Sequence, residues 1–187
     1  MPNFLKLAEG LEIDPVIKRL KARPELWDEI TIRQEFAGSP HADTKTIYLR
    51  GPSEFTPEGY QQSLDSVDYW TLTELSPDVV RLMRHALLDV VQATEIGRVM
   101  IVSLKPGGKV LTHIDEGKYA EHFTRFHLCL TGSPQATMTV GGETMSFQPG
   151  EVWSFNHRVE HSACNLGTES RIHIIFDAVP YNAIHFS

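Results

Sequence analysis

The chain has 187 residues, a formal net charge of −7 at pH 7, 41% hydrophobic residues and 22% charged residues, a composition that is ordinary for a globular domain. No apolar run approaches the roughly 20 residues of a membrane helix, and the acidic balance without a basic stripe argues against nucleic-acid binding. The first residues lack the basic and apolar segments of a secretory signal. We therefore expect one cytoplasmic domain over residues 1–187, with no nucleic-acid or membrane partner.

The N-terminal part, residues 1–97, mixes helix and strand patterns. Residues 13–22 (IDPVIKRLKA) carry a proline near the start of a helical pattern, and PELWDEI after them can add another turn. Residues 44–50 (TKTIYLR) alternate and are rich in β-branched and aromatic side chains, which predicts a strand. Residues 51–63 read as a loop.

The clearest helix is predicted over residues 77–94. Ser76 can cap its first turn, Pro77 suits its first position, and Asp78 complements the helix dipole. Its apolar face consists of Val79, Val80, Leu82, Met83, Ala86, Leu87, Val90 and Val91. Gly97 is expected to stop the helix.

Between residues 98 and 180, strand patterns follow one another at about ten-residue spacing, with glycine or proline at several joints. These patterns are VMIVSLKP, KVLTHID, RFHLCLTG, ATMTVGG, ETMSFQPG, EVWSFNH, VEHSACN and RIHIIFDAV. Because no helix pattern separates them, they predict an antiparallel sandwich or barrel. We expect a mainly β fold in which residues 98–180 form the catalytic β-barrel core and the N-terminal helices pack outside it. The two cysteines, Cys129 and Cys164, belong to no CxxC pair and are expected to be reduced thiols near the core.

His113 and Asp115 stand two residues apart on one predicted strand, so their side chains share a face. Burying such groups without partners costs several kcal/mol, and a metal ion would supply a partner. Together with His161 on a later strand, they match the set of two histidines and one carboxylate that binds iron in non-haem Fe(II) oxygenases. This set leaves three coordination positions open, two for a chelating oxo-acid and one for dioxygen.

Arg171 follows His161 along the chain, near the start of the next predicted strand. A guanidinium fixed inside a barrel needs an anion, and it binds a carboxylate in a bidentate fashion that lysine cannot match. The distal carboxylate of 2-oxoglutarate is the natural candidate.

Three features together resemble the aspartyl/asparaginyl β-hydroxylase family of Fe(II)/2-oxoglutarate dioxygenases: the segment RFHLCL, the segment PGEVWSFNHRVEH and the spacing from His161 to Arg171. The resemblance covers roughly residues 98–180 and implies a double-stranded β-helix, the jelly-roll or cupin-like barrel. It implies hydroxylation of an unactivated C–H bond of an amino acid, either free or within a peptide. Fe(II), 2-oxoglutarate and dioxygen would be required, with ascorbate as an activator in vitro.

The resemblance also implies roles for individual residues. His113 and His161 match the metal-binding histidines of the family, and Arg171 matches its 2-oxoglutarate arginine. Arg125 and His127 match an arginine and a histidine, two apart on one strand, that help to bind the oxo-acid.

Asp115 marks a departure from the animal enzymes that give the family its name, because they carry glycine at this position. The chain departs toward the full triad found in many other 2-oxoglutarate oxygenases, including bacterial relatives that act on free proline. An epidermal-growth-factor-like domain is therefore not implied as the target.

Two other classes of function stay open. One is a cupin-type metal enzyme that does not use 2-oxoglutarate, since Gly107 and the His113–Asp115 segment partly fit the first cupin motif. The other is a non-catalytic metal-binding barrel. In that case His113 and Asp115 could be a surface turn pair, His161 a core histidine, and Arg171 an ion-pair partner of Asp177 or Glu169.

The substrate side is assigned to His41 and Arg50, which flank a predicted strand whose start is crowded with polar residues. They would contact a carboxylate or an amide of the substrate. A solvated turn followed by an edge strand is the alternative. The other histidines considered, His122, His157, His173 and His185, are expected to be structural or exposed.

Overall fold

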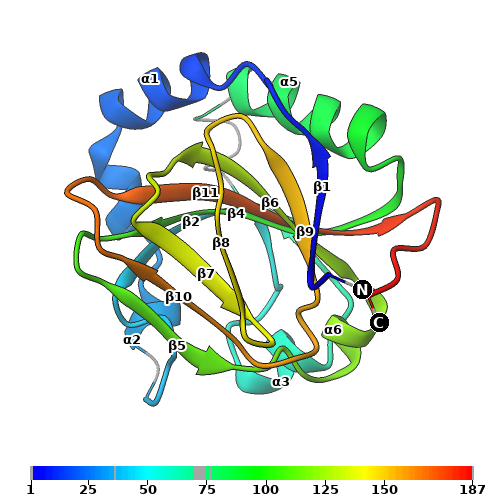
Figure 1. The fold of residues 1–187 in the computed structure, drawn as a ribbon. Coiled ribbons are helices and arrows are strands. Elements are labelled where there is room, and N and C mark those ends of the chain that lie inside the picture. Colours follow the sequence, from blue (N-terminus) through cyan, green and yellow to red (C-terminus); the bar gives the residue numbers. More distant parts are fainter. Residues whose placement is uncertain (1, 36, 70–74, 76, 187) are drawn as a thin grey trace.

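The computed structural model describes residues 2–35, 37–69, 75 and 77–186, whose strands form two antiparallel sheets (Figure 1). The larger sheet contains, in spatial order, β1 (Phe4–Ala8), β9 (Val152–Phe155), β6 (Thr124–Thr131), β11 (Arg171–Pro180), β4 (Ala93–Leu104), β2 (Thr44–Gly51) and β3 (Val67–Asp68). The smaller sheet contains β5 (Lys109–His113), β10 (His161–Asn165), β7 (Ala136–Val140) and β8 (Glu143–Ser146). The predicted mainly β, cupin-like fold is confirmed, and the predicted strands from residue 98 onward correspond to β4–β11.

One apolar core lies between the two sheets. The larger sheet contributes Leu104, Cys129 and Trp153, and the smaller sheet contributes Met138 and Ala163. Because side chains alternate along a strand, the other face of the larger sheet needs its own cover. The faces of the two sheets that meet in this core also enclose the candidate site.

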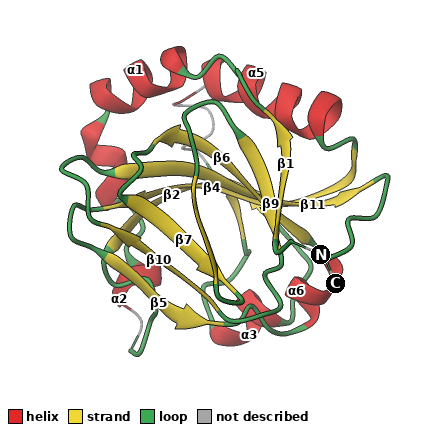
Figure 2. Cartoon of the chain, in the orientation of Figure 1, coloured by secondary structure: helices red, strands yellow, loops and turns green. Residues whose placement is uncertain are grey.

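Helices cover that second face, as the sequence predicts (Figure 2). They are α1 (Asp14–Ala22), which buries Val16 and Leu20, and α5 (Asp78–Arg84), which continues into a π-helical turn, η2 (His85–Val90). Their apolar faces share one core with residues of the larger sheet such as Phe126 and Phe176. A 3-10 turn, η1 (Pro24–Asp28), follows α1 where the extra turn is expected.

The predicted end of the long helix is wrong. Helical structure stops at Val90, Gln92 takes a left-handed conformation with φ of 54°, and β4 begins at Ala93. Gly97 therefore lies inside a strand and does not stop the helix. A Cβ atom at Gly97 would lie 2.5 Å from the hydroxyl oxygen of Tyr119, so the close approach of that ring requires glycine here. Ser76, the predicted cap, lies outside the described residues.

Several short elements differ from the sequence prediction. The predicted loop at 51–63 contains α3 (Pro57–Gln61), and α6 (Lys118–His122) interrupts the run of strands between β5 and β6. β1 and the short α2 (Ile32–Glu35) are further elements that the pattern does not reveal. Both cysteines are free, as expected. Within the described residues, no helix is long and apolar enough to cross a membrane.

Candidate active site

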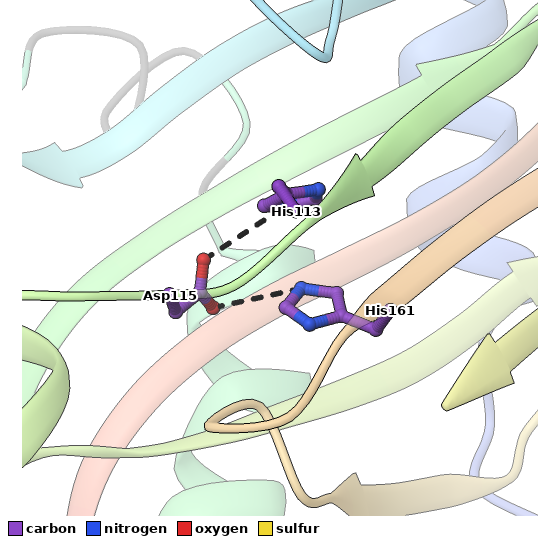
Figure 3. Close-up of side chains that lie close together, drawn as sticks. All are labelled: His113, Asp115 and His161. Atoms are coloured by element: carbon purple, nitrogen blue, oxygen red, sulfur yellow. Dashed lines mark ion pairs between the residues drawn. The ribbon is translucent and has the colours of Figure 1, made fainter. Parts of the chain in front are cut away.

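His113, Asp115 and His161 meet at one edge of the smaller sheet (Figure 3). His113 ends β5 and His161 begins β10, and the two residues are direct cross-strand partners with ring centroids 4.2 Å apart. Asp115 lies two residues past the end of β5, where its backbone N–H donates to the carbonyl of His157. One ligand atom from each of the three side chains lies within 4.8 Å of the others. The structure thus brings the predicted triad together, although Asp115 follows the strand and is not part of it.

The hydrogen bonds of the two imidazoles leave their other nitrogens available for a metal. Nδ1 of His113 donates to the carbonyl of Leu111 at 2.8 Å, and Nδ1 of His161 donates to the carbonyl of Val159 at 2.9 Å. A carbonyl only accepts, so each proton is on Nδ1 and each Nε2 carries a lone pair. These Nε2 atoms lie 3.7 and 3.9 Å from the carboxylate oxygens of Asp115.

The protonation states also suit a metal. Burial lowers the pKa of His113 and of His161 below the usual value, so both are neutral at pH 7. Burial is the largest influence on the Asp115 carboxyl and would raise its pKa, but Arg125 and the surrounding histidines together outweigh burial and lower the pKa. Two neutral imidazoles and one ionised carboxylate are the donor set that a divalent first-row metal such as iron accepts.

Arg125 is held by two carboxylates. Its Nη1 donates to Oδ2 of Asp115 at 2.6 Å, and its Nε and Nη2 donate to the two oxygens of Asp177 at 2.8 and 3.0 Å. Asp177 is the cross-strand partner of Arg125 and also accepts from the hydroxyl of Tyr119. Arg125 lines the cavity described next, but its nitrogens already serve protein carboxylates. Its predicted contact with the oxo-acid stays a prediction.

Arg171 is a buried cation at the first residue of β11, in a cavity that also contains His113 and His161. Burial lowers its pKa to about 10, so it stays charged at neutral pH. No carboxylate pairs with Arg171 in the part of the chain that the structure describes. Asp177, one of the two acids considered as its ion-pair partner, is instead bound to Arg125.

Two histidines connect Arg171 to the middle of this cavity. Nε and Nη2 of Arg171 lie 3.1 Å from Nε2 and Nδ1 of His173, so the guanidinium lies against both ring nitrogens. Nδ1 of His173 also lies 3.2 Å from Nδ1 of His127. Burial lowers the pKa of both histidines well below the usual value. Both rings are thus neutral and fixed in orientation.

A second cavity, of about 370 Å³, adjoins the first and shares Arg33, His41, His113 and Arg125 with it. His113, Asp115 and Arg125 line its inner end, and His41 lies in its wall with its ring 5.0 Å from that of His113. Arg33, which the sequence analysis does not single out, lines both cavities.

Arg50 and His122 lie away from the candidate site, whereas His157 lies next to it. Arg50 lines neither cavity, and its guanidinium pairs with Asp68 at 2.8 Å, so the structure does not bring it to the site. His157 lies beside the triad, with Nδ1 3.8 Å from Asp115. His122 is at the surface and contacts Glu95.

The chain is similar to known proteins in sequence family and in fold. The family model described as aspartyl/asparaginyl beta-hydroxylase matches residues 60–180. No curated protein sequence matches the chain. Among solved structures, the non-heme monooxygenase ThoJ in complex with nickel is 15% identical, and the match covers 95% of this chain and 74% of that chain with a TM-score of 0.56, which shows a shared fold.

Partial matches to cupins also occur. A predicted oxalate decarboxylase from Thermotoga maritima is 17% identical over 51% of this chain and 73% of its own, with a TM-score of 0.37. The cupin domain of Cnp3 from Schizosaccharomyces pombe is 16% identical over 46% and 57%, with a TM-score of 0.37. The family match spans well over half of the sequence, and the chain belongs to the aspartyl/asparaginyl β-hydroxylase family.

Proposed function

We propose that the chain is an iron(II)- and 2-oxoglutarate-dependent hydroxylase that acts on an amino acid, either free or within a peptide. Family and fold make it a cupin-type oxygenase. The observation that carries the finer proposal is a cavity lined by His113 and His161 of the triad and by the buried guanidinium of Arg171, which has no acidic partner among the described residues. A metal with open positions and a fixed guanidinium nearby are the two features that a chelating dicarboxylate needs.

The roles of the residues follow from their contacts. His113 and His161 present Nε2, and Asp115 presents a carboxylate, so the three would hold iron from one side. Iron held there would supply the chemistry that couples decarboxylation of 2-oxoglutarate to succinate with hydroxylation of a C–H bond. Arg125 keeps Asp115 ionised and in place through its ion pair.

The co-substrate end of the cavity is built for an anion. Arg171 binds the distal carboxylate of 2-oxoglutarate, and His173 fixes the guanidinium through Nε. His127 and Arg125 line the same cavity and help Arg171 to bind the oxo-acid. Phe155 and Met138 in the cavity wall keep water away from the bound oxo-acid.

The proposal includes a cytoplasmic location and a small-molecule or peptide substrate, without nucleic-acid or membrane partners. Two free cysteines agree with a reducing compartment.

Succinate release tests the proposal. Purified protein with Fe(II), ascorbate and 2-oxoglutarate should release succinate under air, and a screen of free amino acids and peptides should show a product heavier by one oxygen atom. Asp115→Ala and His161→Ala should abolish both signals. Arg171→Met should raise the KM for 2-oxoglutarate by roughly 30-fold to several thousand-fold, the factor for losing one partner of a buried charge pair.

Arg50→Met is the matched control, because its guanidinium is bound to Asp68 at the surface, and it should leave the KM unchanged. Metal-loaded protein that releases no succinate under air would contradict the proposal. It would point to a cupin-type enzyme that does not use 2-oxoglutarate, or to a binding protein.

A further inference from the structure

The second cavity has the size of a small-molecule site. Its volume of about 370 Å³ lies within the range of ligand pockets, roughly 300–1,000 Å³. His113 and Asp115 close its inner end, and Phe55 and Tyr60 form an aromatic wall. A ligand in it would therefore lie against His113 and Asp115, and Arg171 does not line this cavity.

Three arginines line this cavity, and two of them are already satisfied by the protein. Arg125 binds Asp115 and Asp177. Arg98 donates through its Nη atoms to backbone carbonyls, including that of Tyr60 at 2.8 Å, and its guanidinium lies 3.6 Å from the centroid of the Tyr119 ring; only its Nε lacks a partner. Both arginines thus serve structural contacts.

Arg33 is different. Its Nη2 donates to Nε2 of His41 at 3.2 Å, and its Nη1 is buried with no hydrogen-bond partner. Among the described residues, no carboxylate forms an ion pair with it. A buried guanidinium that lacks both an acid and an acceptor for one of its nitrogens is expected to receive them from a ligand.

The contact with Arg33 also fixes the proton of His41. An arginine N–H only donates, so Nε2 of His41 accepts and the proton lies on Nδ1. This Nδ1 is likewise buried without a partner. Arg33 and His41 therefore offer two unmatched N–H donors and one unpaired positive charge in the cavity that faces the triad.

We propose that the prime substrate is a free amino acid and that Arg33 binds its α-carboxylate, with His41 as a second donor. This inference rests on the proposed hydroxylase function and narrows its substrate class. Asp115 and Glu116 line the same cavity, which disfavours a dianion such as a phosphate ester. Glu116 has no cationic partner in the described chain and is placed to receive an ammonium group. A residue inside a peptide has neither a free carboxylate nor a free ammonium on its backbone.

Binding without turnover tests this assignment. Protein loaded with Zn(II) and 2-oxoglutarate is titrated with each of the twenty L-amino acids and with their carboxamides, and binding is read by saturation-transfer NMR. At least one acid should bind, and its amide should bind at least about tenfold more weakly. Arg33→Met should weaken that acid by roughly 10- to 150-fold, the factor for a lost hydrogen bond to a charged group, and Arg33→Lys should weaken it less.

Two controls separate the substrate role of Arg33 from other roles. Arg50→Met should bind the acid like the wild type, and Arg33→Met should keep the wild-type affinity for 2-oxoglutarate. Thermal melting verifies that each variant is folded, and Arg33→Lys carries the test if Arg33→Met does not fold.

Four results would overturn the inference: no amino acid binds, acid and amide bind equally, both Arg33 variants bind like the wild type, or they lose 2-oxoglutarate instead. The proposed function fails separately, if the amino acid binds but the iron-loaded wild type releases no succinate.

Discussion

Replacing Arg125 with methionine should destabilise the fold by about 3–5 kcal/mol, the cost of breaking a buried ion pair from one side. The size of this destabilisation follows from the two carboxylates that would remain without their arginine. The side chain of Asp177 is 2% exposed and would keep only its hydrogen bond from Tyr119, while the side chain of Asp115, 16% exposed, would lose its one arginine contact. For a chain of 187 residues, this loss corresponds to a fall of about 6–20 °C in Tm.

Urea unfolding in the presence of EDTA, followed by tryptophan fluorescence, measures the effect without any contribution from metal binding. Arg50→Met is the matched control, because Asp68, the carboxylate left without its ion-pair partner, is largely exposed, and the substitution should cost at most about 1 kcal/mol.

The double variant Arg125→Met/Asp177→Asn tests whether the unpaired, buried carboxylate of Asp177 causes the loss of stability. It should be more stable than Arg125→Met alone, because it leaves no unpaired charge at position 177. Equal stability of the single and double variants, or a loss no larger than that of the control, would refute this account of Arg125.

The remaining predictions concern pH and thiol chemistry. His127 and His173 stay neutral in the folded protein because their pKa values lie well below the usual 6.5, whereas the unfolded chain takes up protons as the pH falls below that value. The free energy of unfolding should therefore fall by about 3 kcal/mol for the pair between pH 7.5 and 5.5 in urea titrations. His173→Gln should remove about half of this fall, and a pH slope unchanged by His173→Gln would contradict the assignment. Burial raises the pKa of Cys129 to about 12, so a thiol reagent at pH 8 should modify it only in denaturant. The partly exposed Cys164 should react in the native state, and rapid native labelling of both cysteines would be incompatible with the packing.

Patterns with a short period could be predicted from the sequence. The alternation along residues 98–180 predicts the strands β4–β11, and the spacing of two residues brings His113 and Asp115 into one group. The fold class needs no more than this, because strands without intervening long helices must pair with one another. Family resemblance adds His161 and Arg171 to the same cavity.

What could not be predicted depends on register and on close approach. That His113 and His161 are direct partners, and that Arg125 faces Asp177, follows from how β5 pairs with β10 and β6 with β11, which no local pattern encodes. Arg33 is even less visible, because α2 is a single polar turn without periodicity. The one sequence feature that hints at Arg33 is His41, in the turn before β2, which accepts a hydrogen bond from Arg33.

The end of the predicted helix shows a further limit. A glycine after a helical pattern usually indicates the end of a helix. Gly97 is instead required because the side chain of Tyr119, on another element, packs against it. Glycine signals a need for space or for an unusual conformation, and a sequence does not tell which of the two applies.

The placement of the Asp115 side chain depends on a remote residue, Gly97. The Tyr119 hydroxyl, which any side chain at position 97 would displace, accepts from the backbone N–H of Arg98 and donates to Asp177, and Asp177 anchors the arginine that touches Asp115. A methyl group added at this position of β4 would thus displace Tyr119, and the displacement would pass through Asp177 and Arg125 to the triad. A substitution on this strand would therefore change the geometry of the site, although every residue that faces the substrate stays the same.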